Sequence, residues 1–262
     1  MFKVEKVNRK NEQKIVDFLK SDVIRHVFAL YDIQRDQEHT TIHATFQNGN
    51  PKGYILTYTG TDVLSVVLEC DFDSAETLIR YAPSDSFIIH APPDLIPTIQ
   101  KKFPSEKHYI ENWMLVNKDE VNLFRSILAR QLRVDDASSL ENLLSSQEDR
   151  PKRGLKRYVD WISKMPLYGV FVNGELISYA GSFIQLPEIW MIGGVYTEPT
   201  RRNKGYATLA VSAITEHALK EAETAALFVR SDNYAAIRTY EKLGYQKIGE
   251  KLWVDIGTGL KP

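Results

Sequence analysis

The residues best suited to chemistry form a short basic loop that ends in glycine. Residues 198–205, here called the basic loop, read Glu-Pro-Thr-Arg-Arg-Asn-Lys-Gly. The apolar run 189–195 before it is typical of a buried strand, and from Ala207 onward apolar residues recur at helical spacing. The first turn of a helix offers unpaired N–H groups to an anion, and three cations reinforce them. Since Gly205 has no Cβ, a phosphate can approach closely, so the sequence predicts a pyrophosphate-binding loop.

The spacing within this loop also resembles a known family. Arg202, Gly205 and Ala207, following a strand that ends at Thr197, resemble the acyl-CoA loop of the GNAT N-acetyltransferase superfamily. That loop is written as Gln or Arg, two residues, Gly, one residue, then Gly or Ala. No P-loop pattern is present, and Gly193-Gly194 lacks the third glycine of a dinucleotide fingerprint. The simpler alternative is a basic loop that caps a surface helix.

A second motif follows the next predicted strand, residues 225–230. Asn233, Ala236, Tyr240, Gly244 and Tyr245 resemble the family pattern N-x-x-A-x-x-x-Y-x-x-x-G-[FY]. Helical spacing places Asn233 and Tyr240 on one face, two turns apart. The two motifs occur in the order and spacing of the family.

The resemblance implies a ternary complex in which an amine attacks the thioester of acetyl-CoA directly. The strand end would pair with pantetheine, a backbone N–H near Val195 would polarise the carbonyl, and Tyr240 would act as general acid. A core aromatic on an amphipathic helix is the other interpretation of Tyr240. The implied cofactor-binding residues are Val195, Tyr196, Thr197, Arg202, Asn203, Lys204, Gly205, Tyr206, Ala207, Thr208, Asn233 and Tyr240.

A general base is harder to assign. Glu188, at the start of the long strand, is a candidate base or a solvated charge. His217 is expected to be a partly buried structural residue, and Cys70, the only cysteine, a small core residue. No metal site is expected, because ligand-like spacing is missing among the remaining histidines, His26, His39, His43, His90 and His108.

Composition narrows the class of protein. The chain has 262 residues, 43% of them hydrophobic and 26% charged, which is typical of a soluble globular protein. The net charge of −1 argues against a nucleic-acid partner, and no apolar run reaches the length of a membrane span. The first residues do not resemble a signal peptide, so we expect a cytoplasmic protein.

The order of predicted elements is the same in both halves of the chain, which indicates a divergent tandem. We expect domains at 1–120 and 121–262, with the boundary near 118–129. The predicted fold class is α+β, with two GNAT-like domains, each a twisted, mostly antiparallel sheet flanked by helices. A splayed strand pair in the second would bind acyl-CoA. This arrangement resembles the glycine N-acyltransferase type of the superfamily.

The first half lacks a phosphate loop at the equivalent place. Residues 69–73 read Glu-Cys-Asp-Phe-Asp and carry three carboxylates, which would repel a phosphate. This half is therefore expected to cover the acceptor or to support the second half by packing.

A further basic stretch, residues 150–157, precedes a helix with Tyr158 and Trp161. Its cations would favour an acidic acceptor or the 3′-phosphate of CoA, or they form a solvated helix face, which is the more common case. Tyr158, Trp161 and Tyr168 are either core residues or part of an acceptor pocket.

The sequence thus predicts an acetyl-CoA-dependent N-acetyltransferase that acts on a small-molecule amine or a peptide. The alternative is a non-catalytic acyl-CoA-binding module. The acceptor, the acyl chain length and the oligomeric state are left open by the sequence.

Overall fold

The computed structural model describes residues 3–104, 107–147 and 154–258, and these fall into two compact units. Unit 1 comprises the chain up to Asn112 together with the chain from Gly249 onward. Unit 2 comprises the chain from Trp113 to Ile248. The sequence-based division at residues 120 and 121 assigns the last strand to the second half, whereas most of that strand lies in unit 1.

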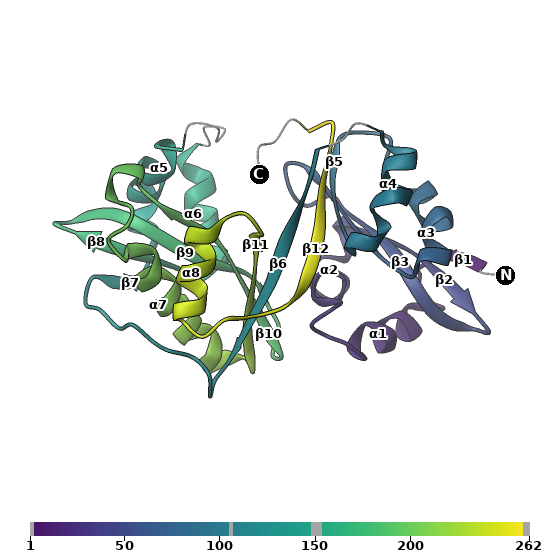
Figure 1. Ribbon diagram of the computed structural model, residues 1–262, viewed down its shortest axis with the longest axis horizontal. Coiled ribbons are helices and arrows are strands. Elements are labelled where there is room, and N and C mark those ends of the chain that lie inside the picture. Colours follow the sequence, from purple (N-terminus) through teal and green to yellow (C-terminus); the bar gives the residue numbers. More distant parts are fainter. Residues whose placement is uncertain (1–2, 105–106, 148–153, 259–262) are drawn as a thin grey trace. The chain divides into compact units, whose positions relative to one another are not determined.

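Unit 1 begins with a strand and two helices, followed by three successive strands and then a helix, a strand and a helix (Figure 1). Its elements are β1 Lys3–Lys6, α1 Glu12–Lys20, α2 Val27–Arg35, the 3-10 turn Gln37–His39, β2 Thr40–Gln47, β3 Asn50–Tyr58, β4 Leu64–Glu69, α3 Phe72–Leu78, the 3-10 turn Ile79–Tyr81, β5 Phe87–Ala91, the 3-10 turn Pro93–Leu95 and α4 Ile96–Lys102.

The sheet of unit 1 has the strand order β1-β2-β3-β4-β5-β12, in which β12 is the last strand of the chain, Gln246–Ile256. The β4–β5 pair is parallel and the others are antiparallel. Helices α3 and α4 pack against residues of β3, β4, β5 and β12 in one apolar cluster. Leu252, Val254 and Ile256 of β12 are buried there, so the C-terminal strand completes the core of unit 1.

Unit 2 repeats this succession of elements (Figure 1). Its elements are β6 Lys107–Asn117, of which the part from Trp113 belongs here, β7 Ala129–Gln131, the 3-10 turn Val134–Asp136, α5 Ala137–Ser145, α6 Leu155–Lys164, β8 Leu167–Val172, β9 Glu175–Gln185, β10 Ile189–Thr197, the 3-10 turn Pro199–Arg201, α7 Tyr206–Glu221, β11 Thr224–Arg230 and α8 Tyr234–Lys242.

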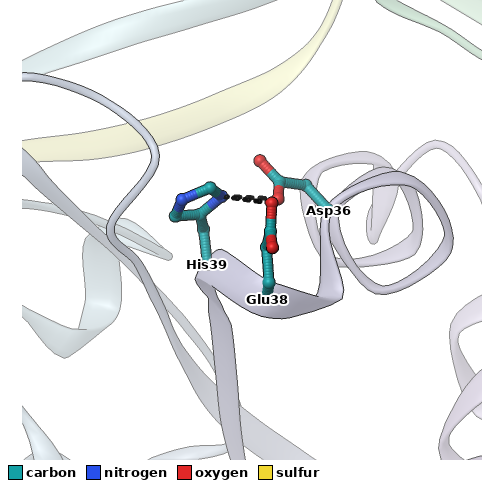
Figure 2. A group of neighbouring side chains, drawn as sticks. All are labelled: Asp36, Glu38 and His39. Atoms are coloured by element: carbon teal, nitrogen blue, oxygen red, sulfur yellow. Dashed lines mark hydrogen bonds and ion pairs between the residues drawn. The ribbon is translucent and has the colours of Figure 1, made fainter.

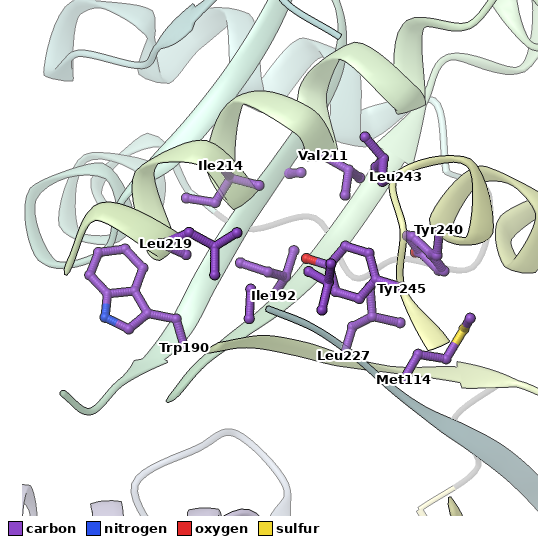
Figure 3. Close-up of a cluster of buried hydrophobic side chains, with 14 of the residues drawn as sticks. Met114, Trp190, Ile192, Val211, Ile214, Leu219, Leu227, Tyr240, Leu243 and Tyr245 are labelled. Carbon is purple, nitrogen blue, oxygen red and sulfur yellow. The ribbon is translucent and has the colours of Figure 1, made fainter. Parts of the chain in front are cut away.

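The sheet of unit 2 has the strand order β6-β11-β10-β9-β8-β7, with β10 and β11 parallel. Neighbouring residues of β9 belong to different clusters, Ala180 with α7 and α8 and Tyr179 with α5 and α6. Since successive side chains of a strand point to opposite faces, α7 and α8 cover one face of the sheet and α5 and α6 cover the other. Figure 3 shows the first of these clusters.

Helix α7 begins directly after Gly205, as the sequence predicts. Ala210, Val211, Ile214 and Ala218 on its inner face are fully buried. None of the helices in the described part of the chain is long and apolar enough to cross a membrane.

The two units have the same order of elements, strand-helix-helix-strand-strand-strand-helix-strand-helix. Each sheet has a sixth strand: in unit 1 it is β12, the last strand of the chain, and in unit 2 it is β6, which directly precedes β7 in the sequence. The predicted α+β fold class with mostly antiparallel sheets is confirmed.

An ion triad lies in unit 1 at the end of β4, with Glu69 and Lys251 buried and Arg25 about half exposed. The carboxylate of Glu69, whose side chain is only 2% exposed, accepts a hydrogen bond from Arg25 Nε at 2.7 Å and another from Lys251 on β12. The side chain of Lys251 is also buried. Because Lys251 lies on β12 and Glu69 on β4, this ion pair joins β12 to the rest of unit 1. Removing one partner would leave the other charge buried and uncompensated.

We expect Glu69→Gln to lower the free energy of unfolding by about 3–5 kcal/mol in urea denaturation, because Lys251 remains buried without its counter-ion. Glu76→Gln, which removes an exposed pair with Lys101, should cost less than about 1 kcal/mol. The double change Glu69→Met with Lys251→Met should recover part of the loss. Equal effects of the two single changes would contradict the importance of the triad.

Candidate active site

The parallel strands β10 and β11 separate half-way along. Among the described residues, their pairing ends at Ile192 and Leu227, although both strands continue. On its other edge β10 shifts register against β9 between Gly193 and Tyr196, and Gly194 adopts a left-handed φ of 65°. Such a bulge bends a strand away from its neighbour. The last residues of β10 therefore present backbone groups that an extended ligand could pair with, as predicted.

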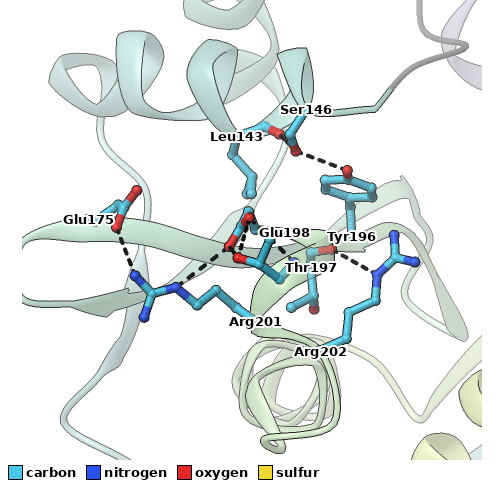
Figure 4. Close-up of polar contacts among 9 residues, drawn as sticks. Leu143, Ser146, Glu175, Tyr196, Thr197, Glu198, Arg201 and Arg202 are labelled. Carbon is cyan, nitrogen blue, oxygen red and sulfur yellow. Dashed lines mark hydrogen bonds and ion pairs between the residues drawn. The ribbon is translucent and has the colours of Figure 1, made fainter.

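The basic loop is held in shape by its own acidic residue. The carboxylate of Glu198 accepts a hydrogen bond from Thr200 Oγ1 at 2.7 Å and lies 3.6 Å from the guanidinium of Arg201 (Figure 4). Arg201 lies at the same distance from Glu175 on β9. Its charge is thus offset in part within the protein.

Arg202 and Tyr196 fix the end of β10. Arg202 Nε donates to the backbone oxygen of Thr197 at 3.2 Å, and its guanidinium lies over the Tyr196 ring, 5.7 Å from the centroid. The Tyr196 hydroxyl is in turn hydrogen-bonded to Ser146 Oγ at 2.9 Å, just after α5 (Figure 4). These contacts hold the strand end although β11 no longer pairs with it.

Left-handed residues shape the entry to α7. Asn203 and Gly205 have φ values of 63° and 81°. This backbone directs successive N–H groups to one side at the N-terminus of a helix, which is a favourable site for an anion. A Cβ built on Gly205 would meet no atom within 4 Å, so the space above the glycine is open to a ligand.

Helix α8 also lines the site. Asn233 caps it, since its side-chain oxygen accepts a hydrogen bond from Ala236 N at 3.2 Å. Tyr240 is 6% exposed, and burial raises the pKa of its hydroxyl to about 12. The phenol therefore stays protonated at neutral pH and can act as a donor.

These elements surround one cavity of about 530 Å³, which lies wholly within unit 2. Its lining residues are Val195, Tyr196, Thr197, Arg201, Arg202, Asn203, Gly205, Tyr206, Ala207, Thr208, Asn233, Ala235, Ala236, Arg238, Thr239, Tyr240 and Lys242. The structure thus brings together every sequence-predicted cofactor-binding residue except Lys204, which is exposed and does not line the cavity.

The predicted base is not part of this arrangement. Glu188 is exposed in the turn between β9 and β10, at the opposite end of β10 from the cavity. With a rise of about 3.3 Å per residue, it lies on the order of 20 Å from Val195. His217 is half-buried, 3.3 Å from the Tyr168 hydroxyl and against the Trp190 ring, as expected of a structural histidine.

Sequence reasoning did not identify Arg238, Thr239 and Lys242 as cavity residues. With Ala235 they follow the spacing i, i+3, i+4 and i+7, so they share one face of α8. The sequence therefore shows that these residues share a helix face. It does not show that this face lines the cavity, which only the structure reveals.

Unit 1 has no equivalent loop. Only residues 70–71 separate β4 from α3, whereas residues 198–205 separate β10 from α7. Asp71 caps α3 by accepting a hydrogen bond from Ser74 N at 2.9 Å, and Glu69 is buried beside it. Carboxylates thus occupy the place where unit 2 offers an anion site.

Two other predicted features are located by the structure. The first half of the basic stretch, residues 150–153, lies outside the described residues, while Arg157 is placed with its guanidinium 5.6 Å from the Trp161 ring. Tyr158 is buried in the cluster of α5 and α6, in agreement with a core role.

Asp36, Glu38 and His39 of unit 1 lie close together, although the sequence spacing of His39 gave no indication of a ligand set (Figure 2). Asp36 accepts hydrogen bonds from His39 Nδ1 and from the Tyr58 hydroxyl, both at 2.6 Å. The neighbouring carboxylate raises the pKa of His39. These hydrogen bonds within the turn account for the close approach of the three side chains.

Comparisons with known proteins agree with this geometry. Residues 167–254 match the model of the FR47-like protein family. No curated protein sequence matches the chain.

Solved structures resemble the chain over nearly its full length. A Drosophila protein has 13% identity and a TM-score of 0.73, covering 97% of this chain and 98% of its own. A GCN5-related N-acetyltransferase from Sphaerobacter thermophilus has 12% identity and a TM-score of 0.69, with coverages of 100% and 98%. A tandem GNAT protein from the clavulanic acid biosynthesis pathway has 10% identity and a TM-score of 0.59, with coverages of 98% and 100%. The chain therefore has the fold of GNAT acetyltransferases.

We expect Gly205→Ala to weaken binding of CoA at least tenfold in calorimetric titration, because the added methyl group occupies the space open to a phosphate. The cost in folding is about 1–2 kcal/mol, since a non-glycine residue must adopt a left-handed φ. Gly174→Ala is a matched control: its φ is 82°, a Cβ there also meets no atom, and it lies in the β8–β9 hairpin. An equal loss of affinity in both variants would exclude a local effect at the loop.

Proposed function

We propose that the protein is an N-acyltransferase that moves an acyl group, most simply acetyl, from CoA to an amine. The observation that carries the proposal is the shared cavity of the separated β10 edge, the α7 N-terminus and Tyr240. The family match over residues 167–254 and the GNAT fold of the chain support it.

The residues of the cavity fit acyl-CoA in three ways. The backbone amides at Gly205 and the first turn of α7 are suited to the pyrophosphate. The free edge of β10 from Val195 to Thr197 is suited to the pantetheine amides. Arg201 and Arg202 line the same cavity and supply positive charge, even though both also make contacts within the protein.

Acyl-CoA would supply an activated thioester. An amine forms the new C–N bond as the C–S bond breaks, so no nucleophilic side chain is required. A backbone N–H near Val195 is suited to the carbonyl oxygen, which gains negative charge. Tyr240 is assigned as the donor to the departing sulfur, since its raised pKa keeps the hydroxyl protonated.

Among the described residues that line the cavity there is no carboxylate or imidazole. The proton lost by the attacking amine is therefore assigned to water, and solvent returns a proton to Tyr240 before the next turnover. Glu188, at the far end of β10, is not part of the proposed mechanism.

Calorimetric titration with acetyl-CoA tests the proposal most directly. The wild type should bind, and the double variant Arg202→Glu with Gly205→Asp should not, because two carboxylates would face the phosphates. Thiol release with a panel of amines then separates a transferase from an acyl-CoA-binding module, which would bind without turnover. A wild type that binds no acetyl-CoA refutes the proposal.

Tyr240→Phe should lower kcat on the order of 100-fold with little change in KM, as expected for loss of a proton donor. Because burial raises the Tyr240 pKa to about 12, the phenol stays protonated from pH 7 to 9 and the effect should be the same at both. Tyr245→Phe is the control: that hydroxyl is bonded to Thr215 Oγ1 at 2.7 Å and does not line the cavity. Its removal should reduce stability by about 1 kcal/mol and leave kcat unchanged. Wild-type turnover by Tyr240→Phe would remove this residue from the mechanism.

A further inference from the structure

We propose that Arg238 and Lys242 of α8 form a second anion site in the cavity, which binds the 3′-phosphate of CoA and makes the protein select CoA over 3′-dephospho-CoA. This inference rests on the proposed function, since it assigns a part of the same ligand to residues of a different helix.

The first observation is the position of the two cations. Arg238 and Lys242 are four residues apart on α8, with Ala235 and Thr239 on the same face, and all four line the cavity. The basic loop and the N-terminus of α7 line the same cavity from a different part of the chain. The cavity thus has cations from two elements, and a pyrophosphate held by the loop accounts for only one of the two sets.

The second observation is that these two charges are available. In the loop, Arg201 is compensated by Glu175 and Glu198, and Arg202 is directed to the backbone oxygen of Thr197. Within the described part of the chain, by contrast, neither Arg238 nor Lys242 makes a hydrogen bond or an ion pair. Both side chains are exposed.

The third observation is the character of the charge. Among the described residues that line the cavity, no carboxylate opposes the cations. A phosphomonoester carries close to two negative charges at neutral pH and offers three acceptor oxygens. The guanidinium of an Arg beside the ammonium of a Lys can bind such a phosphomonoester through charge-assisted hydrogen bonds. The pyrophosphate, in contrast, is assigned to the backbone amides at the start of α7. The part of CoA that carries a phosphomonoester is the 3′-position.

The experiment compares the affinities of CoA and 3′-dephospho-CoA for the full chain by calorimetric titration. The wild type should bind CoA at least tenfold more tightly. In the double variant Arg238→Gln with Lys242→Gln, the affinity for CoA should fall to that for 3′-dephospho-CoA, which should itself be unchanged. Each single variant should lose part of the preference.

A matched control removes one Arg and one Lys at other positions of unit 2. Arg125→Gln with Lys220→Gln deletes one exposed Arg and one exposed Lys, both paired with Glu216 and both outside this cavity. This variant should keep the wild-type preference, which excludes an effect of net charge. Circular dichroism of both double variants verifies that they fold.

The remaining outcomes overturn the inference in distinguishable ways. Equal affinity of the wild type for both ligands removes the 3′-phosphate site and leaves the proposed function intact. A preference that survives in the Arg238→Gln, Lys242→Gln variant assigns the phosphate to other residues. No binding of either ligand by the wild type refutes the proposed function together with this inference.

Discussion

Backbone N–H and C=O groups that have neither a hydrogen-bond partner nor water destabilise a fold. At the end of β10, the edge next to β11 has no strand partner. After Ile192 the strand leaves β11, and the protein holds it by other means. Arg202 donates to the oxygen of Thr197, and Tyr196 is tied to Ser146. Together with the pairing of Tyr196 and Thr197 with β9, these side-chain contacts hold the strand end, and they leave free the edge of β10 that earlier pairs with β11. The cavity depends on this arrangement, because a fully paired β10 would leave no edge for a ligand.

The two units show how little of a fold determines a site. Both have the same order of elements and one parallel pair, β4–β5 or β10–β11. The difference lies in the turn after the first strand of that pair. In unit 2 it is a loop of residues 198–205 with two left-handed residues, and in unit 1 it is residues 70–71, followed by a helix that Asp71 caps. Glu69 is buried in the same region and pairs with the buried Lys251 and the half-exposed Arg25. Unit 1 therefore has a stabilising ion group at the place where unit 2 offers a ligand site.

Local patterns in the sequence predicted local structure well. The requirement for glycine at position 205, the face of α7 and the cap at Asn233 all follow from residues a few positions apart, and the structure contains each of them. Features that depend on contacts between distant parts of the chain could not be predicted from the sequence. Residues 252–256 of β12 pair with β5 across more than half of the sequence. The sequence places Glu188 at the start of the long strand, but only the fold shows that the cavity forms at the other end of β10. The role of Arg238 required knowledge of which face of α8 meets the cavity.

The charges of the cavity also bear on the missing base. Arg201, Arg202, Arg238 and Lys242 line it, and Tyr240 remains protonated because burial raises its pKa to about 12. Nearby cations disfavour the charged form of an amine and so lower its pKa. An acceptor close to this cavity would therefore lose its proton to water more readily than it does in bulk solution, without a carboxylate to take it. A cavity lined by Arg and Lys side chains and by a protonated tyrosine is thus suited to an anionic cosubstrate and also favours a neutral amine. The lack of a general base among its described lining residues is therefore compatible with acyl transfer.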